Sequence, residues 1–210
     1  MSDLGRFLPL SNRPRGDESA VSTDRREQIA DIVTAAAHVI GQSDPAHAPT
    51  FAVAFLATAG LEKDAAPSGA PLAPTTDPAA PAADPAVLAA VAEGTLATVA
   101  ESVRAGRRRG ARHLVRATRA YLVLARDADV APQLDPAVTG AVALSASTTA
   151  PFARRAAIAG HTVQAVDHGW QFGRGPLLTG TGVQIVSFLL GVTDEPPRRS
   201  AGAAPGTLEQ

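Results

Sequence analysis

The sequence predicts a mostly helical α+β fold that ends in a β-hairpin and a short helix. Apolar residues recur at steps of three and four in several segments before residue 160, whereas β-branched residues alternate after it. A chain of 210 residues with 45% hydrophobic content and a formal net charge of −1 also suits one globular unit. We therefore expect a helical bundle followed by a small C-terminal unit.

Five helices are expected before residue 160, each with an apolar face at helical spacing. They cover residues 24–41, 51–61, 84–106, 110–128 and 135–155. Two of them begin with the pairs Asp84-Pro85 and Asp135-Pro136, in which an N-cap precedes proline at the first helical position. Pro151 is expected to break or kink the last of these helices.

The period changes in the C-terminal part. His161–Val166 alternates around β-branched residues, and the turn residues 173–176 precede Leu177–Thr179, which predicts a hairpin between these two segments. Val183–Leu190 is the expected final helix, which Gly191 ends.

Composition divides the chain into structured and unstructured parts. We expect a disordered N-terminal arm (1–22), a helical bundle (23–160) interrupted by a Pro/Ala-rich loop (64–83), a β-hairpin–helix unit (161–193) and a disordered tail (194–210). The N-terminus lacks the features of a secretory signal, and no apolar run approaches about 20 residues, so a cytoplasmic location without membrane contact is expected. The absence of cysteine excludes disulfides, thiolate zinc sites and cysteine nucleophiles.

The stretch 102–125 contains seven arginines and no acidic residue. Arg109, Arg112, Arg116 and Arg119 form a candidate site for an anionic small molecule, because guanidinium groups pair with phosphate or carboxylate. The alternatives are a solvated helix face and ion pairs with glutamates of the preceding helix. Nucleic acid is not expected as a partner, since the net charge is near zero and no aromatic residues alternate with the arginines.

A second candidate pocket contains His161, Asp167, His168 and Trp170, the one local group of histidines with an acidic neighbour. A zinc enzyme commonly places two ligands four residues apart on a helix, and this chain has no such pair. No metal site and no catalytic residue is therefore assigned from the sequence.

The order of elements from Leu134-Asp135-Pro136 through His161–Trp170 to Leu177–Gly191 resembles the C-terminal part of the mycothiol-dependent maleylpyruvate isomerase family. The resemblance covers residues 110–193. It implies a DinB-like four-helix bundle, of a kind that often pairs, joined to a small α/β unit in an actinobacterial protein.

The metal ligands of that family are not matched in this chain. Ala120 and Leu124 stand where its glutamate and histidine would align, and Phe51–Leu56 stands in place of its Gly-Trp motif. The resemblance thus implies a relative that keeps the scaffold and lacks the metal-activated thiol chemistry.

Three functional hypotheses remain. The leading one is a non-catalytic protein that binds a ligand or self-associates as a homodimer, with no cofactor. The second is a thiol-dependent transferase or isomerase that uses mycothiol, and it predicts a pocket between bundle and hairpin with a histidine and an arginine. The third is a DNA-binding regulator, which predicts a continuous exposed arginine patch.

Overall fold

The computed structural model describes residues 23–65 and 84–200. The predicted N-terminal arm, residues 66–83 of the predicted loop and the last ten residues lie outside the described residues. The described part has a mostly helical α+β fold, as the sequence predicts. Its helices are α1 (Arg26–Gln42), α2 (Ala48–Ala59), α3 (Glu62–Ala65), α4 (Pro85–Ala105), α5 (Ala111–Asp127), α6 (Pro136–Thr149), α7 (Phe152–Ile158) and α8 (Gly182–Leu189).

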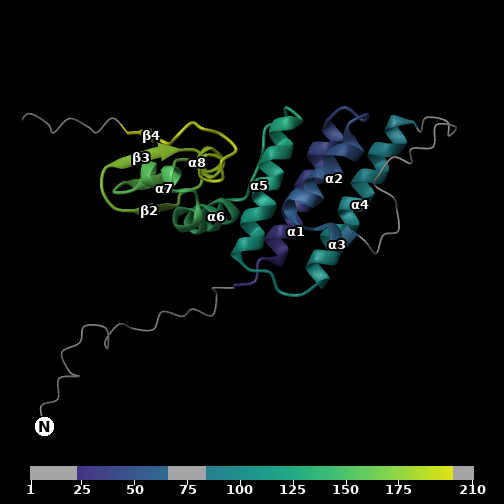
Figure 1. Cartoon of the computed structure of the whole chain (residues 1–210), viewed down its shortest axis with the longest axis horizontal. Coiled ribbons are helices and arrows are strands. Elements are labelled where there is room, and N and C mark those ends of the chain that lie inside the picture. Colours follow the sequence, from purple (N-terminus) through teal and green to yellow (C-terminus); the bar gives the residue numbers. More distant parts are fainter. Residues whose placement is uncertain (1–22, 66–83, 201–210) are drawn as a thin grey trace, which may run out of the picture.

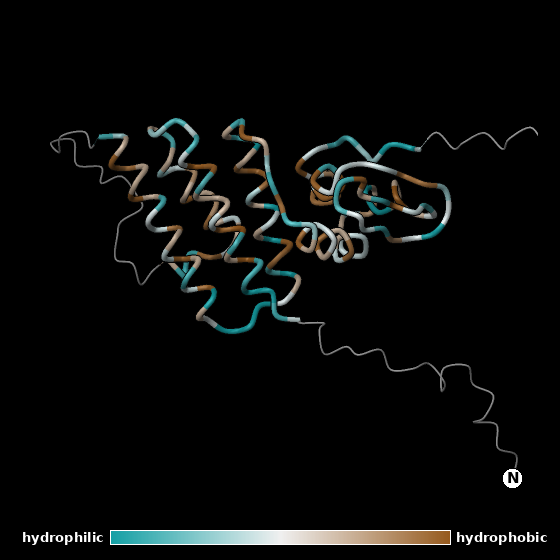
Figure 2. Tube along the Cα trace, turned by 180° about the vertical axis from the view of Figure 1, so that it is seen from behind, coloured by the Kyte–Doolittle hydropathy of each residue, from teal (hydrophilic) through white to brown (hydrophobic). Residues whose placement is uncertain are grey.

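The helices α1, α2, α4 and α5 form a bundle, and the elements after α5 form a separate C-terminal unit beside it (Figure 1). α1 packs against α4 and α5, while α2 packs against the same two helices. Hydrophobic residues recur along the helices and hydrophilic residues gather at the connections between them (Figure 2). The buried polar residues in the described part are Thr95, Thr118, Thr139 and Ser187. The bundle interior is therefore closed and apolar.

Two predicted helix starts are confirmed by their hydrogen bonds. The Asp84 carboxylate accepts from Ala86 N at 2.9 Å, and the Asp135 carboxylate accepts from Ala137 N at 2.7 Å. Each aspartate satisfies an amide that has no partner within its own helix, and the following proline needs none. Pro151 also acts as expected, because α6 ends at Thr149 and α7 begins at Phe152.

The prediction of a simple hairpin is wrong. The described strands form one mixed sheet with the order β2-β1-β3-β4. They are β1 (Thr162–Ala165), β2 (Gln171–Gly173), β3 (Leu177–Gly180) and β4 (Arg198–Arg199). β1 pairs antiparallel with β2 and parallel with β3.

The turn at residues 173–176 reverses the chain a second time and places β3 on the other side of β1. Gly173 and Gly175 have φ of 88° and 118°, and a Cβ atom at either position would collide with a backbone carbonyl of residues 160–161. The partner of β1 in the hairpin is therefore β2, a three-residue strand whose pattern is too short to detect from periodicity.

The predicted disordered tail begins too early. Residues 194–200 are described, and β4 pairs antiparallel with β3. Arg154 of α7 holds this segment, since its guanidinium donates to Thr193 O at 2.6 Å and pairs with Asp194 at 2.7 Å. These contacts join residues that are far apart in the chain, so the composition of this Pro- and Arg-rich segment could not predict them.

One helix of the described part, α4, is long and apolar enough to cross a membrane by length and composition alone. The sequence predicted a helix here, but it predicted no apolar run long enough to cross a membrane. One side of α4 contributes core residues such as Leu96 and Val99, and the core helix of a bundle meets the same criteria. The finding is therefore weak evidence in either direction.

Candidate functional site

The predicted arginine site is divided among separate structural contacts. Arg109 lies before α5 and pairs with Asp64 at 2.6 Å, with side chains that are 12% and 15% exposed. Arg116 donates to Thr58 O and Ala57 O at the end of α2, at 2.7 and 3.0 Å.

The other two arginines of the predicted site, Arg119 and Arg112, differ in their hydrogen bonding. Arg119 donates to Leu190 O at the end of α8, at 3.2 Å. Arginines suit these positions because the last carbonyls of a helix lack partners and carry partial negative charge. Arg112 is exposed and has no hydrogen bond or ion pair to another described residue. The four guanidinium groups therefore do not converge on one anion, and three of the arginines expected in a DNA-binding patch are engaged within the protein.

The second predicted group assembles in part. Asp167 accepts from Gly182 N at 2.8 Å, so its carboxylate caps the start of α8. The Nε2 atom of His168 lies 3.6 Å from that carboxylate, and its Nδ1 atom lies 2.7 Å from Thr139 Oγ1. Trp170 Nε1 donates to the same hydroxyl at 3.1 Å. His161, at the other end of β1, instead contacts Ala159 O at 2.9 Å.

This cluster joins α6 to the β1–β2 connection and to α8. Thr139 is fully buried, and Gly182 packs so closely on His168 that a Cβ atom there would collide with the imidazole. No group of three or more His, Asp or Glu side chains within residues 23–65 and 84–200 is placed to hold a metal ion. The cluster is thus a structural junction, and its acidic and basic groups are already paired.

A pocket of about 540 Å³ lies between α5, α8 and the chain from Val192 to Arg198. This volume is in the range of sites for small organic molecules. Its walls are mostly apolar, and they are formed by Leu122, Pro132, Val166, Val183, Val192, Pro196 and Pro197. None of the histidines lines it.

Neutral polar side chains enter the pocket mainly from α8. Thr181 and Gln184 form the capping box of this helix: Gln184 N donates to Thr181 Oγ1 at 3.1 Å, and Thr181 N donates to Gln184 Oε1 at 3.0 Å. Ser187 follows on the same face, since the three residues are spaced by three. Ser187 is 6% exposed, and its hydroxyl has no hydrogen-bond partner among the described residues. A hydroxyl that faces a cavity and has no partner in the protein is suited to bind a ligand.

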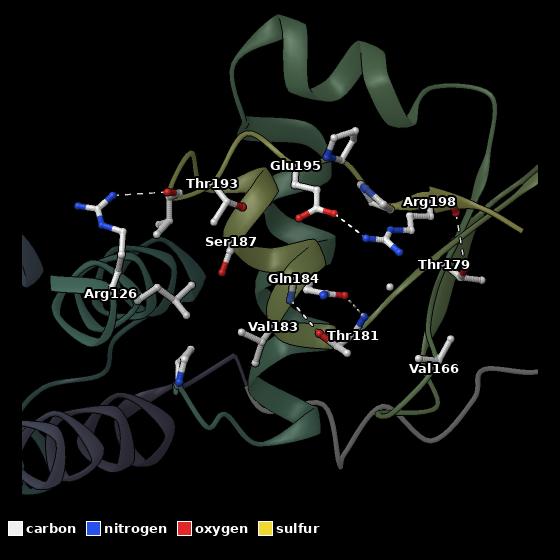
Figure 3. A pocket seen from close by; sticks show the side chains of 16 residues that line it. Arg126, Val166, Thr179, Thr181, Val183, Gln184, Ser187, Thr193, Glu195 and Arg198 are labelled. Carbon is white, nitrogen blue, oxygen red and sulfur yellow. Dashed lines mark hydrogen bonds and ion pairs between the residues drawn. The ribbon is translucent and has the colours of Figure 1, made fainter. Parts of the chain in front are cut away.

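Charged side chains stand at the two ends of the pocket. Figure 3 shows Arg126 on the α5 side of α8, and the Glu195–Arg198 ion pair on the side of the strands. The Glu195–Arg198 pair measures 3.0 Å. The guanidinium of Arg126 contacts Asp127 at 2.9 Å and lies 3.5 Å from Val192 O.

Tyr121 fixes the wall that carries Pro132. Its hydroxyl donates to Gln133 O at 3.1 Å and accepts from Gln133 N at 3.0 Å. Burial raises the pKa of Tyr121 above its ordinary value, so the phenol stays protonated and keeps both bonds. This residue holds the α5–α6 connection against α5.

Sequence reasoning did not find this pocket. One signal was present, because Thr181 followed three residues later by Gln184 is the spacing of a capping box and marks the start of α8. The remaining lining residues come from four separate stretches of the chain, and no local pattern joins them. Comparison of the chain with protein-family models, with curated proteins and with solved structures finds no match in any of the three.

Proposed function

We propose that this protein is a non-catalytic binding protein that takes up a small organic ligand in the pocket between α5 and α8. The observation that supports this proposal best is the hydroxyl of Ser187, a residue only 6% exposed, which faces an apolar cavity and has no partner among the described residues. A thiol-dependent transferase would need a histidine beside an arginine here. The lining contains two arginines and no histidine, which favours binding over proton-transfer chemistry.

The test uses the fluorescent dye 8-anilinonaphthalene-1-sulfonate, whose emission rises in apolar surroundings. We expect saturable binding of one dye per chain. Val183→Trp places an indole in the pocket and is expected to abolish this binding. The matched control is Leu144→Trp, because Leu144 is 60% exposed on α6 and does not line the pocket. Unchanged binding by the Val183 variant, or no saturable binding by the wild type, would refute the proposal.

A second candidate function, self-association, is favoured by the outer surfaces of α2 and α4. α2 contains no charged residue, and Val87 and Val91 on α4 are 56% and 44% exposed. Two charged residues of α4 lie towards α1: Glu93 packs at Gly41, and Arg104 pairs with Asp31 at 3.0 Å. Glu101 is 74% exposed and follows Val87 and Val91 on the outer side of the helix. The N-terminal half of the outer face is therefore apolar and uncharged, which is unusual for a helix in contact with water.

A second copy of this chain fits that face. The 21 residues of α4 span about 31 Å, and with the neighbouring α2 the face covers roughly 600 Å². A standard interface buries about 800 Å² on each partner, so the area approaches what a dimer needs.

Sedimentation equilibrium tests this second function. The wild type is expected to sediment as a dimer, and Val91→Glu as a monomer. Leu144→Glu is the matched control, because Leu144 is an exposed apolar residue on α6, outside the bundle. A monomeric wild type at 100 μM, or an Val91 variant that still dimerises, would exclude this face as the interface.

A further inference from the structure

We infer that the pocket selects an organic monoanion, a carboxylate on an apolar body, whose charged group lies at the Arg126 end. This inference rests on the proposed binding function and specifies the class of ligand. It is argued from the charges, the free hydroxyl and the apolar walls of the pocket.

The charge balance of the lining favours a ligand with one negative charge. Arg126, Glu195 and Arg198 are the charged residues that line the pocket. Glu195 and Arg198 pair with each other at 3.0 Å, so their charges compensate. Arg126 then leaves one net positive charge. A cationic ligand would find no unpaired acidic residue in the lining, and a dianionic ligand would carry a second negative charge that no lining residue compensates.

Arg126 can exchange its present partner for a ligand. Asp127, the next residue in the chain, does not line the pocket, and the two side chains are 56% and 46% exposed. Exposed ion pairs of this kind contribute little to stability. The bond to Val192 O is long at 3.5 Å, and a guanidinium carries five N–H donors. A carboxylate can therefore bind to Arg126 with two hydrogen bonds.

Ser187 supplies a second donor for the same group. Ser187 is 6% exposed, and Figure 3 shows its side chain directed from α8 towards the side on which α5 carries Arg126. A hydroxyl donates a short hydrogen bond to a carboxylate oxygen. The cationic Arg126 and the neutral donor Ser187 together match the hydrogen-bonding needs of a carboxylate.

The rest of the pocket suits an apolar body. Leu122 lies one helical turn before Arg126 on α5, and the carbonyl of Val192 lies 3.5 Å from the Arg126 guanidinium. Val183, Val166 and the two prolines of the 192–198 segment also line the pocket. Each buried methylene of a ligand gains hydrophobic free energy on entering such a site. A carboxylate with an alkyl or aryl body therefore satisfies both parts of the lining.

The test compares four head groups on one tail: octanoate, 1-octanol, octylammonium and octyl phosphate. Their affinities are measured by isothermal titration calorimetry with the full chain at pH 7.5. Octanoate is expected to bind about 10-fold or more tightly than 1-octanol, which is the size of effect given by a charge-assisted hydrogen bond. Octylammonium is expected not to bind, and octyl phosphate is expected to bind more weakly than octanoate.

Two variants assign the preference to its residues. Arg126→Gln is expected to weaken octanoate binding about 10-fold and to leave 1-octanol unchanged. Arg112→Gln is the matched control, an exposed arginine of the same helix outside the pocket, and it is expected to bind like the wild type. Ser187→Ala is expected to weaken octanoate binding while the unfolding temperature stays the same, because the hydroxyl has no partner in the protein and opens to the pocket.

The outcomes separate the ligand class from the binding function. Equal affinities for octanoate and 1-octanol, both abolished by Val183→Trp, would overturn the carboxylate assignment and leave a pocket that binds apolar molecules. Tighter binding of octyl phosphate would also overturn it. Dye binding to the pocket without binding of octanoate would refute the ligand class alone, whereas the absence of both would refute the proposed function itself.

Discussion

Thr139 and Thr118 are two fully buried threonines whose hydroxyls differ in hydrogen bonding. The hydroxyl of Thr139 accepts from Trp170 Nε1 at 3.1 Å and lies 2.7 Å from His168 Nδ1. The hydroxyl of Thr118, inside the bundle on α5, has no partner among the described residues. Replacement by valine keeps the shape of either side chain and removes only the hydroxyl, so the two variants should change stability in opposite directions.

The expected magnitudes follow from these contacts. Thr139→Val leaves the nitrogens of two rings without this partner, and each buried unsatisfied group costs about 1–3 kcal/mol. Water reaches part of both rings, so we expect a total loss of about 2–4 kcal/mol in the free energy of unfolding. Thr118→Val removes a buried hydroxyl that is unpaired, and it is expected to raise the free energy of unfolding by about 1 kcal/mol.

Urea denaturation measures both changes. Circular dichroism follows the helices, and the fluorescence of Trp170, the single tryptophan of the chain, follows the C-terminal unit. A Thr139 variant within about 0.5 kcal/mol of the wild type, a typical spread for neutral substitutions, would refute the role of this hydroxyl. An equal loss in both variants would show that hydrogen bonding does not distinguish the two sites.

Three further predictions concern single charges. Asp64→Asn leaves Arg109 without its ion pair in a mostly buried position, and we expect urea denaturation to show a loss of about 2–4 kcal/mol. Asp135→Ala removes the N-cap of α6 and should cost about 1 kcal/mol in the same assay, whereas no change would mean that proline alone starts this helix. Partial desolvation, with the charges of Arg109 and Arg112, lowers the pKa of His113 from its ordinary 6.5, so protonation disfavours the folded state and stability falls as the pH drops through that value. The His113→Gln variant should therefore have the unfolding temperature of the wild type at pH 8 and a higher unfolding temperature than the wild type at pH 5. An equal dependence of the unfolding temperature on pH in both proteins would contradict a role of His113 protonation.

The helices were predictable because their signals are local. The Asp-Pro pairs at Asp84 and Asp135 fix two helix starts within one turn of chain, and Pro151 separates α6 from α7 for the same local reason. Apolar spacing of three and four then identifies which side of each helix is buried. These features depend on neighbours in the sequence, so a linear reading can find them.

The sheet was predictable only in part. Alternation identified β1 and β3, but it did not reveal that they pair in parallel with β2 on the far side of β1. Strand order depends on contacts between distant residues, and strands of two to four residues carry little periodicity. The fourth strand lies in a stretch that resembles a disordered tail by composition.

By itself, the sequence determined the longer helices, the starts of two of them at Asp84 and Asp135, and the α+β class, because capping and periodicity act over a few residues. It did not predict α3 or the start of α2 at Ala48. It also placed a row of arginines along and just before α5, but their partners were decided by packing: Arg109 reaches Asp64, while Arg116 and Arg119 reach the ends of α2 and α8. The pocket belongs entirely to the tertiary structure. Its free hydroxyl at Ser187 and its cation at Arg126 are 61 positions apart in the chain (187 − 126), and only the packing of α6 against both α5 and α8 brings them to one cavity.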